Sequence, residues 1–294
     1  MFTVLGKRPA LRGALLMTAA CFVFAAMNAI VRLGSEELHV FQMVFFRNAF
    51  GMVLIIPILV QGWPQVLRTK QQPLYAARAV SSLAAMLLWF WSLSKLALAD
   101  AVALSFTMPL FVTIGAALFL GEAVKLRRWS ATLAGLLGAL VILRPGQNPL
   151  IAESLLVILS AVFMATSAML IKILVRTDRS STIVSYMVLY LTPLSLVAAI
   201  PVWQWPSAQG WFLMVALGGC ATAGQYLFTT AVRDADVSAI MPFDFFRLPF
   251  SALLGFWLFD QMADVWTWVG AAIIFGAGIY IVHRESRLGV DVSR

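Results

Sequence analysis

The sequence has 294 residues, of which 62% are hydrophobic and only 12% are charged, with a formal net charge of +8. Soluble domains contain roughly 45–50% apolar and about 25% charged residues, so the composition excludes an ordinary soluble fold and predicts a protein of the lipid bilayer. The positive charge does not indicate a nucleic-acid partner, because the basic residues lie in short clusters between apolar runs, as they do on the cytoplasmic side of membrane proteins.

Ten apolar runs divide the chain, and we expect each to cross the bilayer as an α-helix. A spanning helix needs about 20 apolar residues, and these runs are too long for the strands of a membrane barrel. The predicted fold is therefore an all-α polytopic membrane protein. Its ten spans are 11–33, 40–61, 74–95, 99–120, 128–144, 150–174, 182–202, 211–232, 236–258 and 265–283.

The Lys and Arg residues predict the orientation of these spans. If the N-terminus is cytoplasmic, most of the 21 basic residues fall in cytoplasmic segments, as the positive-inside rule requires. We therefore expect both termini in the cytoplasm, with 285–294 as a short tail. The first run follows Lys7, Arg8 and Arg12 and is long enough to span, so we interpret it as a retained helix rather than a signal peptide.

Three sequence patterns recur in the same order in the two halves of the chain. CFVFAAMNA at 21–29 matches SAVFMATSA at 160–168, and FWSLSKLALADAVAL at 90–104 matches YLFTTAVRDADVSAI at 226–240. An Ile-Pro pair lies near the ends of the second and seventh spans. We infer a duplicated five-helix unit, 11–146 and 149–284. Because five is odd, the copies are inverted repeats, a plan that places the substrate site at the repeat interface near the midplane.

The ninth span contains two ionisable residues, which are expensive in lipid and usually functional. In MPFDFFRLPF at 241–250, Asp244 and Arg247 are three residues apart and share a helix face. Pro242 and Pro249 flank them and can bend the helix. Two interpretations stay open. The pair could face a cavity and bind a zwitterionic substrate, or it could be satisfied within itself and fix helix packing.

Other intramembrane polar and aromatic residues are candidates for the cavity wall. Arg47, in the second span, could line an external vestibule or extend outward to the interface. Trp89 and Gln225 occupy equivalent positions in the two repeats, as do Asn28 and Ser167, and each could instead serve packing. The predicted cavity residues are Asn28, Arg47, Trp89, Ser92, Ser167, Gln225, Tyr226, Asp244 and Arg247, and the predicted kinks are at Pro109, Pro242 and Pro249.

The fifth and tenth spans are rich in small residues at four-residue spacings, which favour close helix contact. We interpret these spans as scaffold that could also form a homodimer face. The sequence has no cluster of His, Cys, Asp and Glu at metal-ligand spacing and no phosphate-binding loop. We therefore expect no metal, no cofactor, no enzymatic activity and no use of ATP.

Two segments carry a family resemblance. They are LSKLALADAVALSFTMPLF at 93–111, which joins the third and fourth spans, and LFLGEAVKLRRWSATLAGLLGALVILRPG at 118–146. The second has a helix that ends in Gly-Glu, then a basic loop, a Trp and a glycine-spaced helix. With the five-helix duplication, these segments resemble the drug/metabolite transporter superfamily in its ten-helix EamA branch, over nearly the whole chain.

Within that branch the chain resembles bacterial amino-acid exporters. The resemblance implies a secondary transporter in the bacterial inner membrane that exports or exchanges small metabolites, aromatic and apolar amino acids included, and we expect alternating access around a central cavity. Drugs or other metabolites are alternative substrates, and a passive pore or a receptor-like protein is the alternative class. The second repeat departs from the pattern, since Phe259-Asp260 stands where the first repeat has Gly121-Glu122. Aligning these acids requires about two inserted residues in the ninth span.

Overall fold

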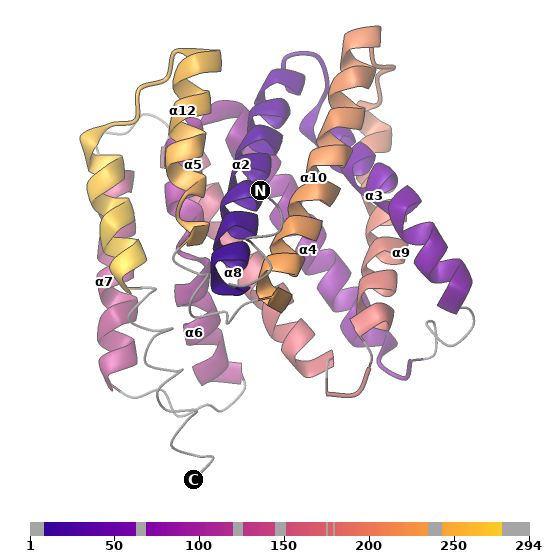
Figure 1. Cartoon of the computed structure of the whole chain (residues 1–294), viewed down its shortest axis with the longest axis horizontal. Helices are drawn as coiled ribbons and strands as arrows, with labels where there is room; N and C mark the ends of the chain where they lie inside the picture. The colour runs from indigo at the N-terminus through magenta and orange to yellow at the C-terminus, as the bar shows by residue number, and fades with distance from the viewer. Residues whose placement is uncertain are drawn as a thin grey trace.

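The computed structural model describes residues 9–62, 69–119, 126–144, 151–174, 176–178, 180–234 and 243–277. Within these ranges the chain forms helices and short connections and contains no strand. Long helices stand side by side in one bundle (Figure 1). This arrangement pairs the backbone groups inside each segment, as lipid requires.

Every predicted span has a helix in the structure. Six helices are long and apolar enough to cross a membrane, and four shorter apolar helices fall on the remaining spans; the shorter ones are Val40–Val53, Leu133–Leu143, Arg247–Phe259 and Val265–Ala277. The prediction of an all-α polytopic membrane protein is therefore confirmed. The first repeat consists of α2 (Pro9–Gly34), α3 (Val40–Gly62), α4 (Gln72–Lys95), α5 (Leu98–Ser105), α6 (Met108–Phe119) and α7 (Leu126–Leu143). The second consists of α8 (Ile151–Leu174), α9 (Ser180–Ala199) with a 3-10 turn at Ile200–Val202, α10 (Ala208–Asp234), α12 (Arg247–Phe259) and a last helix, Val265–Ala277.

Helices of one repeat pack on helices of the other in matching pairs. Helix α2 packs on α10 as α8 packs on α4, and α12 packs on α2 as α6 packs on α8. Helix α3 contacts α10 as α9 contacts α4, while α3 meets α9 and α5 meets α12. The principal contacts of α2, α3 and α6 therefore match those of their counterparts α8, α9 and α12, as a duplicated structure requires.

The repeats run in opposite directions. Arg32, near the end of α2, donates to the carbonyl oxygens of Leu93 and Leu96 at the end of α4. Ser92, in the same turn of α4, donates to the carbonyl oxygen of Glu153 at the start of α8. Helix α2 thus ends on the face where α8 begins, and the prediction of inverted repeats is confirmed. We call this the Glu37 face, after the loop that follows α2, and the opposite one the Asp178 face, after the loop that follows α8.

The fourth and ninth spans are both interrupted. The fourth is split into α5 and α6 by a turn at Phe106 and Thr107, just before Pro109. In the ninth, a turn at Phe245 and Phe246 precedes α12. Proline is tolerated in the first turn of a helix because the amide it removes has no partner there, and both Pro109 and Pro249 lie in such first turns. Pro242 lies outside the described residues.

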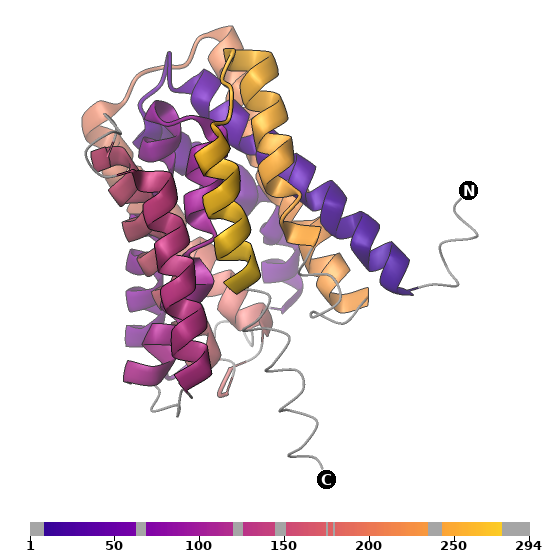
Figure 2. The same cartoon turned by 90° about the vertical axis from the view of Figure 1, so that its left-hand side faces the viewer.

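The small residues of the fifth and tenth spans pack against each other within the chain. A Cβ atom added to Gly138 would lie 2.8 Å from the carbonyl oxygen of Gly270, and one added to Gly270 would lie 2.5 Å from that of Gly138. Helix α7 and the last helix therefore touch through their backbones, on the side of the bundle that faces the viewer in Figure 2. The small-residue surface predicted as a homodimer face is thus used inside one molecule, while Leu133, Leu137 and Leu140 are exposed.

Candidate substrate-binding site

The interruption of the ninth span holds Asp244 and Arg247 against α2. Arg247 Nη2 lies 2.5 Å from Asp244 Oδ1, so the two residues form an ion pair with each other. The guanidinium carbon of Arg247 lies 5.1 Å from the centre of the Phe24 ring, in the geometry of a cation–π contact. The Cys21 thiol lies 3.7 Å from Asp244 Oδ1. The two charges are therefore paired with each other, and both side chains keep partial exposure.

Two further polar residues lie one helical turn beyond this contact. Asn28 follows Phe24 by four residues on α2, and Ser251 follows Arg247 by four on α12. Their side chains are 2% and 0% exposed, respectively. Asn28 Oδ1, Ser251 Oγ and Arg247 Nε are all buried without a hydrogen-bond partner in the described part of the chain. The sequence analysis missed Ser251, because a single serine in an apolar helix usually bonds to its own backbone and gives no signal.

Aromatic rings surround the interruption. The rings of Phe106 and Phe245 stack with centroids 5.1 Å apart, so the turns that interrupt the fourth and ninth spans meet face to face. Phe245 also stacks on Phe275 at 3.9 Å. A cavity of about 380 Å³ lies at the interruption and is lined by Phe243, Phe245, Phe246, Pro249 and Phe275.

Ser92 and Ser167 belong to a different region, the contact between α4 and α8. Ser82 and Ser167 share a hydrogen bond of 2.8 Å, and Ser92 bonds to the carbonyl oxygen of Glu153 at 3.1 Å. Ser160 donates to the carbonyl oxygen of Ala85 at 2.8 Å. Ser92 and Ser167, predicted as cavity residues, therefore form part of a polar ladder that joins two helices, and Trp89 packs in the main core.

Arg47, Gln225 and Tyr226 lie apart from the ion pair. Arg47 Nη1 is 3.2 Å from Asn48 Oδ1 and 3.7 Å from the sulfur of Met86 on α4. Gln225 donates to Thr229 one turn further along α10 at 3.4 Å. The side chain of Tyr226 is 70% exposed, so the structure places it on the outer surface of α10 rather than beside Asp244.

Polar and aromatic contacts close the Asp178 face. The Asp178 carboxylate accepts hydrogen bonds from Tyr75, at 2.8 Å, and from Thr69, at 2.5 Å. The ring of Tyr75 stacks on that of Tyr186 with centroids 4.6 Å apart. Gln72 bonds to the Tyr186 hydroxyl at 2.8 Å. The loop after α8 is therefore tied to the start of α4, which belongs to the other repeat.

Equivalent contacts close the Glu37 face. The Glu37 carboxylate accepts hydrogen bonds from the backbone N–H and the hydroxyl of Ser207, at 2.6 and 2.9 Å. The ring of Phe46 lies 5.1 Å from that of Trp211. The loop after α2 is thus tied to the start of α10, again across the repeats. We call these two sets of contacts the Asp178 closure and the Glu37 closure. The sequence analysis missed both, although each combines an acid after the first helix of one repeat with an aromatic residue near the start of the third helix of the other repeat.

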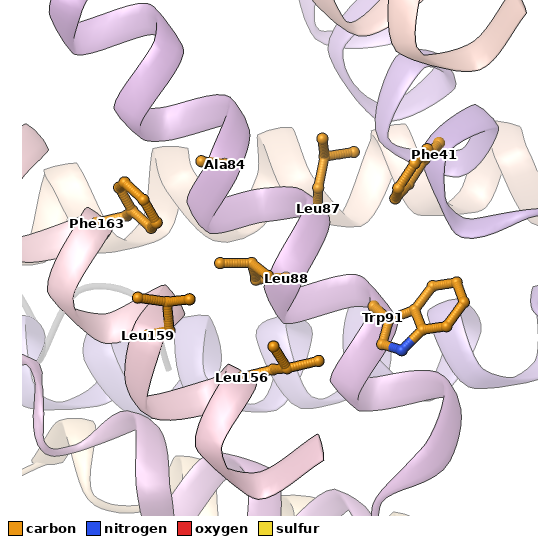
Figure 3. Close-up of a pocket in the computed structure, with 8 residues that line it drawn as sticks. All are labelled: Phe41, Ala84, Leu87, Leu88, Trp91, Leu156, Leu159 and Phe163. Atoms are coloured by element: carbon orange, nitrogen blue, oxygen red, sulfur yellow. The ribbon is translucent and has the colours of Figure 1, made fainter. Parts of the chain in front are cut away.

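A second cavity, of about 550 Å³, is wholly apolar (Figure 3). Its walls come from α3, α4 and α8, and Trp91 and Leu159 in these walls are partly exposed. No described residue of the interrupted ninth span lines this cavity, so we do not assign it to the substrate. The lining residues are Phe41, Ala84, Leu87, Leu88, Trp91, Leu156, Leu159 and Phe163.

Comparison with known proteins gives consistent matches over more than nine-tenths of the chain. The family model described as "EamA-like transporter family" matches residues 11–144 and 151–283. The chain is 35% identical to a riboflavin transporter of Vibrio cholerae, with 96% of each chain covered. It is 31% identical to a riboflavin transporter of Brucella anthropi, with 92% of this chain and 98% of the relative covered. One solved crystal structure shares the fold with a TM-score of 0.63 at 18% identity, covering 92% of this chain and 98% of the other.

Proposed function

The chain belongs to the EamA-like transporter family, and from this premise we propose that it is a secondary transporter of riboflavin in a bacterial inner membrane, with both termini cytoplasmic. The main support for riboflavin as the substrate is the similarity of the chain to riboflavin transporters of two bacteria. The identities are 35% and 31% over more than nine-tenths of this chain. We expect transport without ATP, because the sequence has no phosphate-binding loop.

The aromatic cavity suits the shape of this substrate. Riboflavin is a flat, fused aromatic ring system with a chain of hydroxyl groups. Flat rings are recognised by offset stacking on aromatic side chains, and Phe243, Phe245 and Phe246 line the cavity at the interruption. This cavity lies where the two interrupted spans meet, which is where inverted-repeat transporters hold their substrates.

The closed ion pair favours a neutral substrate over the amino acids suggested by the sequence. A zwitterion that used both charges would have to separate Asp244 from Arg247, whose atoms are 2.5 Å apart. Both side chains are mostly buried, so separating the pair leaves two poorly solvated charges, which is costly. Riboflavin has no net charge at neutral pH and leaves the pair intact.

The two closures supply a mechanism of alternating access. Release of Asp178 from Tyr75 and Thr69 would open one face, and release of Glu37 from Ser207 would open the other. Both closures join the two repeats, so rocking of one repeat against the other breaks one while it keeps the other. The interruptions before Pro109 and Pro249 give the fourth and ninth spans the freedom to bend.

A transport assay tests the substrate. We expect expression of the chain to restore growth of a riboflavin-auxotrophic bacterium with poor riboflavin uptake on limiting riboflavin. In proteoliposomes we expect saturable uptake of labelled riboflavin, with counterflow from an unlabelled internal pool. Counterflow distinguishes a carrier from a passive pore. Uptake of labelled phenylalanine or tryptophan without uptake of riboflavin would overturn the proposal and restore the amino-acid prediction.

A further inference from the structure

Three unpartnered polar atoms gather where α2 faces α12. They are Asn28 Oδ1, Arg247 Nε and Ser251 Oγ, each buried without a hydrogen-bond partner among the described residues. Buried polar atoms are nearly always hydrogen-bonded, so each exception calls for an explanation. Other unpartnered atoms exist in the described chain, but these three belong to residues on the two helices that meet through the contact of Phe24 with Arg247.

The direction of the two helices places these groups at similar depth. The segment before α12 contacts Cys21, early in α2, and Phe259 at the end of α12 lies under Arg32, late in α2, at 5.2 Å. The two helices therefore run in the same direction. Phe24 contacts Arg247, and one turn further along each helix come Asn28 and Ser251, on the faces that carry this contact.

The symmetry-related contact, between α8 and α6, satisfies its equivalent groups within the chain. Ser167, the counterpart of Asn28, is hydrogen-bonded to Ser82 at 2.8 Å. Thr113, the counterpart of Ser251 when Glu122 is aligned with Asp260, donates to the carbonyl oxygen of Pro109 at 3.1 Å. The polar groups of the α8–α6 contact thus have protein partners, whereas those of the α2–α12 contact lack them. This asymmetry indicates a partner from outside the chain on the α2–α12 side.

The chemistry of the three atoms defines that partner. Asn28 Oδ1 requires a donor, the Arg247 Nε–H requires an acceptor, and the Ser251 hydroxyl can do either. A hydroxyl group both donates and accepts, so a polyhydroxylated chain can satisfy all three. We propose that Asn28, Arg247 and Ser251 form a subsite for the hydroxyl-bearing chain of the substrate. This inference rests on the proposed function, in which the aromatic cavity holds the ring system.

Two substrates separate the subsite from the rest of the site. Riboflavin carries the ribityl chain, and lumiflavin has the same ring system with a methyl group in its place. Uptake of each into proteoliposomes is measured for the wild type, Asn28→Ala and Ser251→Ala. A site built to bond a hydroxyl discriminates strongly when that bond is removed, so we expect the KM for riboflavin to rise roughly tenfold and that for lumiflavin to stay unchanged.

A matched control removes another buried serine. Ser160→Ala deletes a hydroxyl from the α4–α8 ladder and should leave the ratio of the two KM values at its wild-type value. Elution of each variant as a monodisperse protein in size-exclusion chromatography verifies folding. Wild-type transport of both flavins, with parallel changes or none in the Asn28 and Ser251 variants, would overturn the subsite and leave the proposed function standing. Failure of the wild type to transport either flavin would overturn both.

Discussion

Arg247 joins three kinds of interaction in one side chain. It forms an ion pair with Asp244, lies over the ring of Phe24, and keeps its Nε buried without a partner in the described structure. Each interaction uses a different part of the guanidinium group, which is planar and carries several donors. The residue therefore fixes the interrupted ninth span to α2 and still has a donor available.

Removing one member of the pair should cost more stability than removing both. Asp244→Asn or Arg247→Gln leaves its partner without a counter-charge, and an unsatisfied buried group costs about 1–3 kcal/mol. The double variant leaves two neutral amides that can bond to each other. Thermal unfolding in detergent, followed by tryptophan fluorescence, should give a higher Tm for the double variant than for the worse single variant. Additive losses in Tm would contradict this coupling.

The site residues show which part of the sequence analysis succeeded. Asp244 and Arg247 could be singled out because charge is rare in lipid-embedded segments. Gln225 and Tyr226 were both predicted to face the cavity, yet neighbours on a helix point about 100° apart, so one helix rotation cannot suit both. The rotation of α10 was not predictable, because its polar and apolar residues are not separated onto two faces of the helix. Ser251 could not be singled out from the sequence, because its lack of a hydrogen-bond partner is visible only in the assembled helices.

At the scale of helices, close backbone contact replaces side-chain packing between α7 and the last helix. Gly138 and Gly270 allow each helix to approach the carbonyl oxygen of the other. Small residues at such contacts are typical of membrane bundles, where dispersion rather than the hydrophobic effect holds helices together. The four-residue spacing in the sequence predicted a contact surface correctly, but it did not indicate whether the partner was the same chain or another.

Substitution at this contact should be destabilising at one glycine and harmless at another on the same helix. The Cβ of Gly270→Ala would overlap Ile142 and the carbonyl oxygen of Gly138, and overpacking of this kind costs about 1–3 kcal/mol. Gly276→Ala is the matched control, since its Cβ meets nothing within 4 Å. We expect a lower Tm only for Gly270→Ala. Equal Tm values for the two variants would show that the helices do not touch here.

At the scale of the whole molecule, the two closures make the faces equivalent. Glu37 and Asp178 each tie a loop of one repeat to the start of a helix in the other. The ten spans and their duplication followed from sequence, because lipid imposes length and apolarity and the repeats share patterns. The closures could not be predicted this way, since Glu37 and Ser207 lie far apart in the chain and only the assembled bundle brings them together.

Weakening either closure should expose the interior on one side. Asp178→Asn should increase labelling of a cysteine placed at Met86 by a membrane-impermeant maleimide applied to the Asp178 face. Glu37→Gln should increase labelling from the Glu37 face. Both variants are made in a background without Cys21 and Cys220. Glu153→Gln is the control, because the hydrogen bond to Ser92 uses only its backbone. Increased labelling from the same side in both acid variants would contradict the assignment of two opposed closures.

The packing of each repeat on the other also determines the order in which the protein assembles in the cell. The most extensive helix contacts join α2 to α10 and α4 to α8, so helices of the first repeat find their principal neighbours only in the second. During synthesis, α2 and α4 enter the bilayer before these neighbours have been translated. Insertion of the first five helices therefore precedes their packing. The surface between α2 and α12, where we place the substrate, is completed only when the ninth span has left the ribosome.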